Sequence, residues 1–412
     1  MSARPPRPGA PGRDTGRPGD VVELEVGPVA HGGTCVARDN GRVVFVRHAL
    51  PGERVRARLT DTSHARYWRA DAVEVLRAST DRVDPPCPHA GAGRCGGCDW
   101  QHASVAAQRR FKAEVVREQL HRLAGLDHPV EVEALDGAPE GLGWRTRMRY
   151  TLTERGEVAL RGSRSHEVVP AADCRIAHPL VRAAVAGRRF EGVDAVEVAA
   201  SVSSGTVVVT PVAADADADA DAEAEVVESV RGRRFRLDPG VFWQVHPGAP
   251  DALVDAVLTG LTPRAGETAL DLYAGAGLFA ASLAEAVGPG GRVVAMESDP
   301  QAVASAARSL ADLPQVSLRG VRVSPASLRG LAGAGADVVV LDPPRAGAGA
   351  AVMRALLALR PRAVAYVSCD PASLARDLAV AVTQGYSLVG LRAFDLFPMT
   401  AHVECVALLE ER

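Results

Sequence analysis

The carboxyl-terminal part of the chain alternates between short apolar runs and longer segments with helical periodicity. Each run is rich in valine, leucine and alanine, which is typical of strands buried on both faces. The strand-like runs lie at 268–272, 292–297, 336–341 and 363–368, and the helical segments at 278–287, after 297 through 313, and at 371–384. Because strands and helices follow one another in this way, residues 238–412 are predicted to form a mostly parallel, doubly wound, Rossmann-like α/β sheet.

Two further strand-like runs, 386–391 and 402–409, close the chain. No helix is expected between them, so they are predicted to pair antiparallel. This ending favours a methyltransferase-type sheet over a dehydrogenase-type sheet.

The amino-terminal part shows a different pattern, in which apolar and polar residues alternate over short runs. Such runs lie at 21–26, 35–37, 43–46, 55–59 and 70–75. Asn40-Gly41 is a strong hairpin signal between the second and third of them. Several short strands separated by glycine and proline turns predict a small OB-like β-barrel over residues 20–78.

The intervening stretch, 79–237, is predicted to be a β-rich central domain. A helix is expected at 108–123, and strands at 147–152 and 206–209. The alanine–aspartate repeat at 213–225 is interpreted as an acidic, solvated insertion of low complexity.

Residues 1–19 are rich in proline, glycine and arginine and lack the apolar core of a signal peptide. We therefore expect a disordered tail on a cytoplasmic protein. No run approaches 18 uninterrupted apolar residues, so no membrane span is predicted.

The formal charge of −3 hides a basic protein. Seven acidic residues lie in or beside the insertion, and without them the formal charge of the remaining residues is +4. These seven are Asp215, Asp217, Asp219, Asp221, Glu223, Glu225 and Glu228. Lys112 is the one lysine, so nearly all the basic residues are arginines. Guanidinium groups bind phosphate oxygens in a fork, which suits nucleic acid, although a GC-rich genome explains the bias equally well.

Three of the seven cysteines crowd together as Cys87, Cys95 and Cys98, and Cys174 stands far downstream. Four thiolates suit an iron–sulfur cluster or a structural zinc, and unligated thiols are the third reading. His89 is interpreted as a loop residue, and Cys35 as part of the barrel core.

Glycines follow the first strand of the sheet in the run Asp271-Leu272-Tyr273-Ala274-Gly275-Ala276-Gly277. Glycines there let the backbone approach a ligand. Glu297 ends the next strand, where a carboxylate accepts hydrogen bonds from ribose hydroxyls. S-adenosylmethionine and NAD both satisfy this pattern.

Three short motifs lie in the last 75 residues: D-P-P-R (342–345), S-C-D-P (368–371) and F-P-M-T-x-H-V-E (397–404). Together they resemble the signature of the bacterial RNA uracil-5-methyltransferases. The resemblance implies S-adenosylmethionine as methyl donor, Cys369 as nucleophile and Glu404 as general base. It also implies a donor-binding set, which consists of Gln244, Tyr273, Glu297 and Asp342. The chain departs from the family pattern at His246, Leu278 and Asp370.

The same resemblance extends to the front of the chain. The barrel resembles the TRAM domain, which binds RNA, and C-G-G-C-x-W-Q-H (95–102) looks like the segment that binds a [4Fe-4S] cluster in the ribosomal-RNA branch. Cys87, Cys95, Cys98 and Cys174 are the implied ligands. The resemblance therefore favours 23S ribosomal RNA over transfer RNA as the substrate.

The chemistry of uracil explains why the site needs a thiol and a carboxylate. C5 is a poor nucleophile until a thiolate adds to C6, and a base must later remove the C5 proton. Asp370 follows Cys369 directly, and its negative charge is expected to raise the pKa of the Cys369 thiol unless Arg345 or Arg376 offsets that charge. Cys405 is expected to point into the core.

Two other functions are compatible with parts of this pattern. A non-catalytic RNA-binding or chaperone protein would keep the fold without needing Cys369 or Glu404. An NAD-dependent or iron–sulfur redox protein would share the glycine loop and the cysteines. A cytosine-5-methyltransferase would carry a different motif around its cysteine.

Overall fold

The computed structural model describes residues 16–163, 165, 167–213, 224–331 and 335–412. The predicted acidic insertion at 213–225 and the predicted tail at 1–19 lie largely outside these residues. The chain divides into two compact units, Met1–Ala30 with Thr34–Thr80, and His31–Gly33 with Asp81–Arg412.

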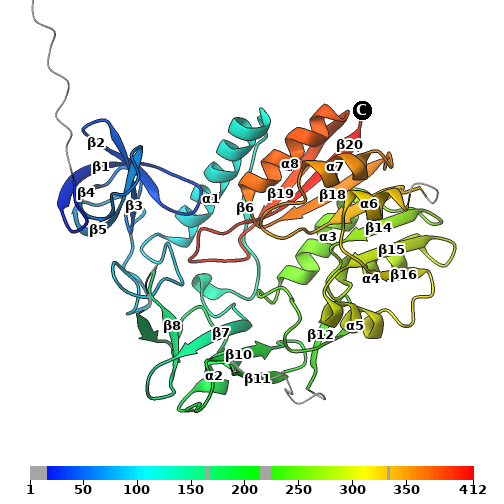
Figure 1. The fold of residues 1–412 in the computed structure, drawn as a ribbon, viewed down its shortest axis with the longest axis horizontal. Helices are drawn as coiled ribbons and strands as arrows, with labels where there is room; N and C mark the ends of the chain where they lie inside the picture. The colour runs from blue at the N-terminus through cyan, green and yellow to red at the C-terminus, as the bar shows by residue number, and fades with distance from the viewer. Residues whose placement is uncertain (1–15, 164, 166, 214–223, 332–334) are drawn as a thin grey trace, which may run out of the picture. The chain divides into compact units, whose positions relative to one another are not determined.

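The first unit is a closed five-stranded barrel, as predicted (Figure 1). Its strands follow the order β1-β2-β3-β5-β4, with bounds β1 Val21–Val29, β2 Cys35–Asp39, β3 Arg42–Arg47, β4 Arg54–Asp61 and β5 Tyr67–Arg77. Asn40 and Gly41 both have positive φ, at 46° and 86°, which is the backbone of a tight hairpin turn. Cys35 is fully buried, as predicted, and its thiol donates to Ala49 O at 3.2 Å.

The second unit begins with a central region built on antiparallel strands. A five-stranded sheet has the order β11-β10-β7-β8-β9, and β12 and β13 form a separate hairpin. The strand bounds are β7 Arg147–Leu152, β8 Val158–Arg161, β9 Val168–Pro170, β10 Ala195–Ala200, β11 Val207–Val212, β12 Val226–Val230 and β13 Arg233–Leu237. The helical elements are α1 Val105–Gln119, η1 Leu120–Ala124, η2 Pro139–Gly141 and α2 Pro179–Val185.

An eight-stranded sheet dominates the rest of this unit, in the order β16-β15-β14-β17-β18-β20-β19-β6. Its strands are β6 Val132–Glu133, β14 Thr268–Leu272, β15 Arg292–Glu297, β16 Val316–Gly320, β17 Val338–Leu341, β18 Ala363–Ser368, β19 Tyr386–Phe394 and β20 Glu404–Glu411. Strands β14 to β18 are parallel, and β20 is antiparallel to both β18 and β19, as predicted for the last two strands.

Helices cover both faces of this sheet, which confirms the doubly wound fold. Their bounds are α3 Ala249–Leu261, α4 Leu278–Val287, α5 Pro300–Ser309, α6 Pro325–Arg329, α7 Ala350–Leu357 and α8 Pro371–Thr383. One buried core joins the sheet to α3, α4 and α5, and a second joins its other face to α1, α6, α7 and α8. Along the described part of the chain, each helix is too short or too polar to cross a membrane.

Some predicted limits were wrong by a few residues. The helix expected to reach 313 ends at Ser309, where the next residue, Leu310, leaves the helical backbone with φ of −109° and ψ of 4°. The last strand begins at Glu404 instead of 402, after a loop that starts at Asp395. The two-residue strand β6 pairs with Ala393 and Phe394 from 261 positions away, and so short a run gives no periodic signal.

Candidate active site

The sheet topology brings three predicted site residues to one edge. Asp342 follows the last residue of β17, and Cys369 follows the last residue of the neighbouring strand β18. Glu404 is the first residue of β20, which runs antiparallel beside β18. Reversal of β20 therefore places its beginning at the same edge as the carboxyl ends of the parallel strands, where α/β folds bind ligands.

The thiol of Cys369 is half-buried in a negatively charged environment. Burial raises its pKa to about 12, and the charges of Glu404 and Asp342 act in the same direction. Arg345 acts in the opposite direction, by its charge and by a hydrogen bond to the thiol. Of the two arginines expected to offset the negative charge, Arg345 is the one with a large effect on the pKa of Cys369.

Asp370 follows the thiol directly in the chain, but it is not among the groups with the largest effects on the pKa of Cys369. Its carboxylate caps α8 by accepting the Ser373 N–H at 2.7 Å, and it lies 2.9 Å from His31 Nε2 of the same compact unit. Burial raises the pKa of Asp370, but these two hydrogen bonds outweigh it and hold the pKa below its usual range.

Two carboxyl groups beside the thiol favour the protonated form. Glu404 is only 3% exposed, and burial followed by the charge of Asp342 raises its pKa well above the usual value. Burial also raises the pKa of Asp342 to about 7. Asp271, at the end of β14, is fully buried and its pKa is raised to about 8, first by burial and then by Asp342 and Glu297. A carboxyl group with a pKa near neutrality is well suited to proton transfer.

The glycine loop between β14 and α4 has the strained backbone expected of a ligand-binding turn. Tyr273, Gly275 and Gly277 have φ of 64°, 52° and 88°. The Gly275 N–H donates to Glu297 Oε2 at 2.9 Å, so the acid at the end of β15 also fixes this loop. A Cβ atom at Gly277 would lie 2.8 Å from Leu310 Cδ1, and the φ of 88° disfavours a larger residue there as well.

Gln244, the fourth member of the predicted donor-binding set, comes from the segment between β13 and α3. Its side chain is 8% exposed. Among the described residues, no hydrogen bond joins it to Tyr273, Glu297 or Asp342. Leu278, where the sequence departs from the family pattern, begins α4 and is buried.

A buried carboxylate that the sequence analysis missed holds the loop after D-P-P-R. Asp377 Oδ2 accepts hydrogen bonds from Ala348 N–H at 2.8 Å, Gly349 N–H at 3.1 Å and the Tyr366 hydroxyl at 2.7 Å. These contacts fix the segment that begins with Asp342 and Arg345. The sequence feature that could have indicated this role is the position of Asp377 on the buried face of a helix, next to Leu378.

The four cysteines named as cluster ligands lie near one another. The pKa of Cys98 is raised to about 12, first by burial and then by the charges of Cys174, Cys95 and Cys87. Cys98 Sγ accepts from Gln101 Nε2 at 3.2 Å, and Cys95 Sγ from the Gly97 N–H at 3.5 Å. The described residues nevertheless include no group of three or more His, Cys, Asp or Glu arranged to hold a metal ion. His89 lies in a loop, 3.6 Å from Asp173.

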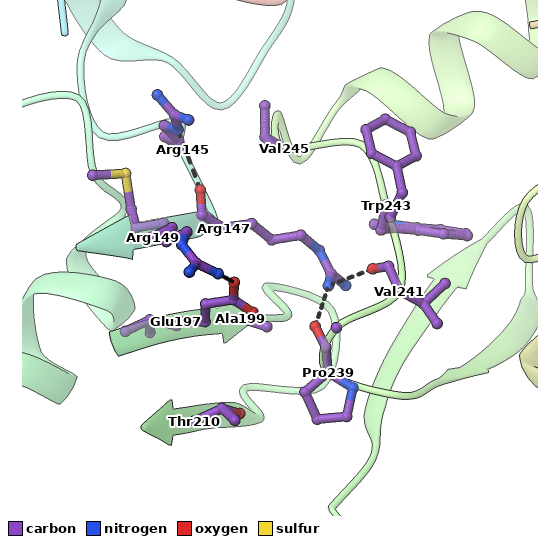
Figure 2. A pocket seen from close by; sticks show the side chains of 14 residues that line it. Arg145, Arg147, Arg149, Glu197, Ala199, Thr210, Pro239, Val241, Trp243 and Val245 are labelled. Carbon is purple, nitrogen blue, oxygen red and sulfur yellow. Dashed lines mark hydrogen bonds and ion pairs between the residues drawn. The ribbon is translucent and has the colours of Figure 1, made fainter. Parts of the chain in front are cut away.

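A pocket lies beside Gln244, between β7, β10 and the segment 239–245 (Figure 2). Figure 2 shows Arg147 reaching from β7 to this segment, where its guanidinium donates to Pro239 O at 3.4 Å and Val241 O at 3.3 Å. Arg145 and Arg149 line the same pocket, and Phe242 on its wall is 68% exposed. Glu197 lines the pocket too and pairs with Arg149, so three arginines and one glutamate leave the lining with a net positive charge beside one exposed aromatic ring. The sequence pattern did not predict this pocket.

Comparisons with known proteins match this architecture. The family described as TRAM domain matches residues 17–73, and the family described as tRNA (Uracil-5-)-methyltransferase matches residues 229–412. A Halomonas elongata protein, the 23S rRNA (uracil(1939)-C(5))-methyltransferase RlmD, is 36% identical over 94% of this chain and 89% of its own. This chain belongs to the S-adenosylmethionine-dependent RNA (uracil-5-)-methyltransferase family.

Another relative and a solved structure align with nearly the whole chain. A Streptomyces avermitilis protein described as an uncharacterized RNA methyltransferase is 48% identical over 95% of this chain and 98% of its own. The crystal structure of Pyrococcus abyssi tRNA (uracil-54, C5)-methyltransferase with S-adenosyl-L-homocysteine superposes with a TM-score of 0.69. The match covers 93% of this chain and 99% of the Pyrococcus abyssi chain at 22% identity. The two proteins therefore share one fold.

The opposing charges around Cys369 predict opposite effects on its reactivity. Arg345→Ala removes the charge that lowers the thiol pKa, so the thiolate fraction at a given pH falls; Glu404→Gln removes a charge that raises it, so the fraction rises. We expect alkylation of Cys369 by iodoacetamide at pH 9 to slow by about 3- to 10-fold in Arg345→Ala and to accelerate in Glu404→Gln.

Peptide mass spectrometry measures this rate separately for each cysteine. In the wild type, alkylation of Cys369 should still accelerate with rising pH at about pH 9 to 10, because only the thiolate reacts and burial raises the pKa of this thiol. Cys405, buried next to the site, serves as the unreactive reference. An unchanged rate in Arg345→Ala, or a slower one in Glu404→Gln, would contradict the charge arrangement.

Proposed function

We propose that this protein transfers a methyl group from S-adenosylmethionine to C5 of a uridine in structured RNA, through a covalent adduct of Cys369. The observation that carries the proposal is the placement of Cys369, Arg345 and Glu404 at one edge of the sheet. A nucleophile, a cation that favours its thiolate and a base with a raised pKa are the groups that this reaction needs.

Cys369 acts first. Its thiolate adds to C6 of the uracil ring, and the electron pair of the C5–C6 bond moves to C5 and its neighbouring carbonyl. Arg345, hydrogen-bonded to the thiol, stabilises the thiolate before the addition. The activated C5 then attacks the electrophilic methyl group that the donor supplies, and S-adenosylhomocysteine leaves.

Glu404 acts second. C5 now carries both the new methyl group and its original proton. The Glu404 carboxylate takes that proton, the C5–C6 double bond re-forms, and the C6–S electron pair returns to Cys369. Its raised pKa makes the glutamate a stronger base than an exposed carboxylate.

Four residues are proposed to bind the methyl donor: Gln244, Tyr273, Glu297 and Asp342. Glu297 suits ribose hydroxyls, because it ends β15 beside the glycine loop. The buried acids of this edge favour a cationic ligand, and the sulfonium is a cation. Leu278 contributes an apolar surface in place of a polar contact.

We favour 23S ribosomal RNA as the substrate. The Halomonas elongata relative with this specificity aligns with 94% of the chain. Transfer RNA is the second candidate, because the solved structure with the same fold is a tRNA methyltransferase. The target base has to leave its stack to reach Cys369, and the barrel of residues 20–78 and the basic pocket of Arg145 and Arg149 are proposed to bind the surrounding phosphates.

We also propose that Cys87, Cys95, Cys98 and Cys174 hold a [4Fe-4S] cluster. Burial raises the pKa values of Cys95, Cys98 and Cys174, and repulsion from the neighbouring thiols adds to this; a bound cation would relieve the repulsion. The N–H groups that point to Cys95 and Cys98 are of the kind that stabilise cluster sulfur. The cluster takes no part in the steps above.

Anaerobic purification tests the cluster. We expect about four iron and four sulfide per chain, with visible absorbance, and a loss of most of the iron in Cys98→Ser. Cys35→Ser, in the barrel core, should keep the iron content. Stoichiometric zinc without sulfide would contradict a cluster and support a structural zinc instead.

Tritium release from RNA labelled at uracil C5 tests the reaction. Wild-type protein with S-adenosylmethionine should release tritium from unmodified 23S RNA or transfer RNA, and Cys369→Ala should lower the rate to background, a loss of at least about 1,000-fold. Donor binding should survive in the variant. No release from either RNA by donor-bound wild type would overturn the proposal for these substrates.

A further inference from the structure

The loop Asp395–Val403, which joins β19 to β20, leads directly into Glu404 (the red loop in Figure 1). Most of this loop is buried. Met399 within it has φ of 69°, in the left-handed region that a non-glycine residue rarely adopts. Such a backbone persists only where surrounding contacts determine it.

Gln108 of α1 supplies the first of these contacts. Its side chain is fully buried, and its Oε1 accepts the Met399 N–H at 2.8 Å. Its Nε2 donates to Ala103 O at 2.9 Å and Trp100 O at 3.1 Å, and lies 3.3 Å from Met399 Sδ. Both polar atoms of the Gln108 amide therefore form hydrogen bonds, and α1 in this way fixes the strained backbone of Met399.

The segment after Cys98 holds the loop from another direction. Met399 O accepts the N–H groups of Asp99 at 2.9 Å and Trp100 at 3.0 Å. Asp99 Oδ2 accepts the Ala401 N–H at 3.0 Å. Met399 and Ala401, five and three positions before Glu404, are thus fixed by the segment that follows Cys98, a predicted cluster ligand.

A buried ion pair fixes the start of the loop. Lys112, one turn beyond Gln108, donates from Nζ to Asp395 Oδ1 at 2.5 Å and to Phe397 O at 3.0 Å. The two side chains of the ion pair are 0% and 2% exposed. A buried pair of this kind contributes orientation more clearly than stability.

We propose that Asp99, Gln108 and Lys112 are positioning residues for Glu404, and that they determine the removal of the C5 proton. This inference rests on the proposed function. Cys369 and Asp342 follow other strands, so these three contacts do not hold them. The loop also approaches Arg345, whose Nη2 lies 3.4 Å from His402 Nε2. Because Cys369 and Asp342 are held on other strands, displacement of the loop should affect proton removal far more than methyl transfer.

The chemistry separates the two steps. Methyl transfer is complete while Cys369 is still bonded to C6, and the adduct breaks down only when a base takes the C5 proton. A displaced Glu404 should leave methylated RNA attached to the protein. A variant that is merely unstable would lose both steps in equal proportion.

Gln108→Ala tests the proposal in single-turnover reactions that follow two labels: methyl transfer from labelled S-adenosylmethionine and tritium release from C5. We expect tritium release to slow by about 10- to 100-fold with methyl transfer affected much less, since misplacing a catalytic group by about 1 Å has effects of this size. The methylated protein–RNA adduct should accumulate on a denaturing gel. Gln119→Ala is the matched control, because Gln119 is a buried glutamine of the same helix whose side chain, within the described part of the chain, bonds Glu118 and Arg122 and not the loop.

Asp99→Ala gives a second test at a half-buried position, for the case that Gln108→Ala does not fold. Asp99→Asn retains an oxygen for the Ala401 N–H and should restore most of the release rate. Equal loss of both labels in Gln108→Ala and Asp99→Ala, or unchanged release in both, overturns the positioning role. Absence of tritium release by the wild type is a different result, which overturns the proposed function itself.

Discussion

The active-site edge depends on one electrostatic constraint: the Cys369 thiol lies close to the buried carboxyl groups of Glu404 and Asp342, and the guanidinium of Arg345 opposes their effect. In isolation this arrangement favours a protonated thiol and protonated acids. A cationic methyl donor changes the balance, because it stabilises the ionised carboxylates. The site is therefore better suited to the ternary complex than to the free protein, as expected of a catalyst that binds its transition state best.

The fold keeps these groups in place through contacts outside the immediate site. The antiparallel strand β20 brings Glu404 to the edge where the parallel strands end. Asp377 fixes the loop that carries Arg345, and α1 fixes the loop that leads to Glu404. The catalytic domain thus relies on α1, a helix that precedes it in the chain by more than 100 residues and packs on one face of its sheet.

The sequence predicts the fold well because strand and helix periodicity is local. The barrel, the doubly wound sheet and the antiparallel ending are confirmed, and several strands, such as β18 at Ala363–Ser368, have the predicted limits. The functional roles of Cys369, Glu404 and the donor-binding residues stay predictions. Contacts between distant segments could not be predicted, since Gln108 and Met399 are 291 residues apart. Lys112 did offer a signal, as a lone lysine among the apolar positions of a helix, but only the structure shows its partner.

The most direct test of the central claim is to trap the covalent adduct with RNA that carries 5-fluorouridine at the target position. After methyl transfer C5 of this analogue has no proton for Glu404 to remove, so the bond between Cys369 and C6 should persist. Intact-protein mass spectrometry should then show donor-dependent attachment of the RNA, and peptide mapping should place it on Cys369. Methylated analogue that is released without any adduct, or an adduct on another cysteine, would contradict catalysis through this thiol.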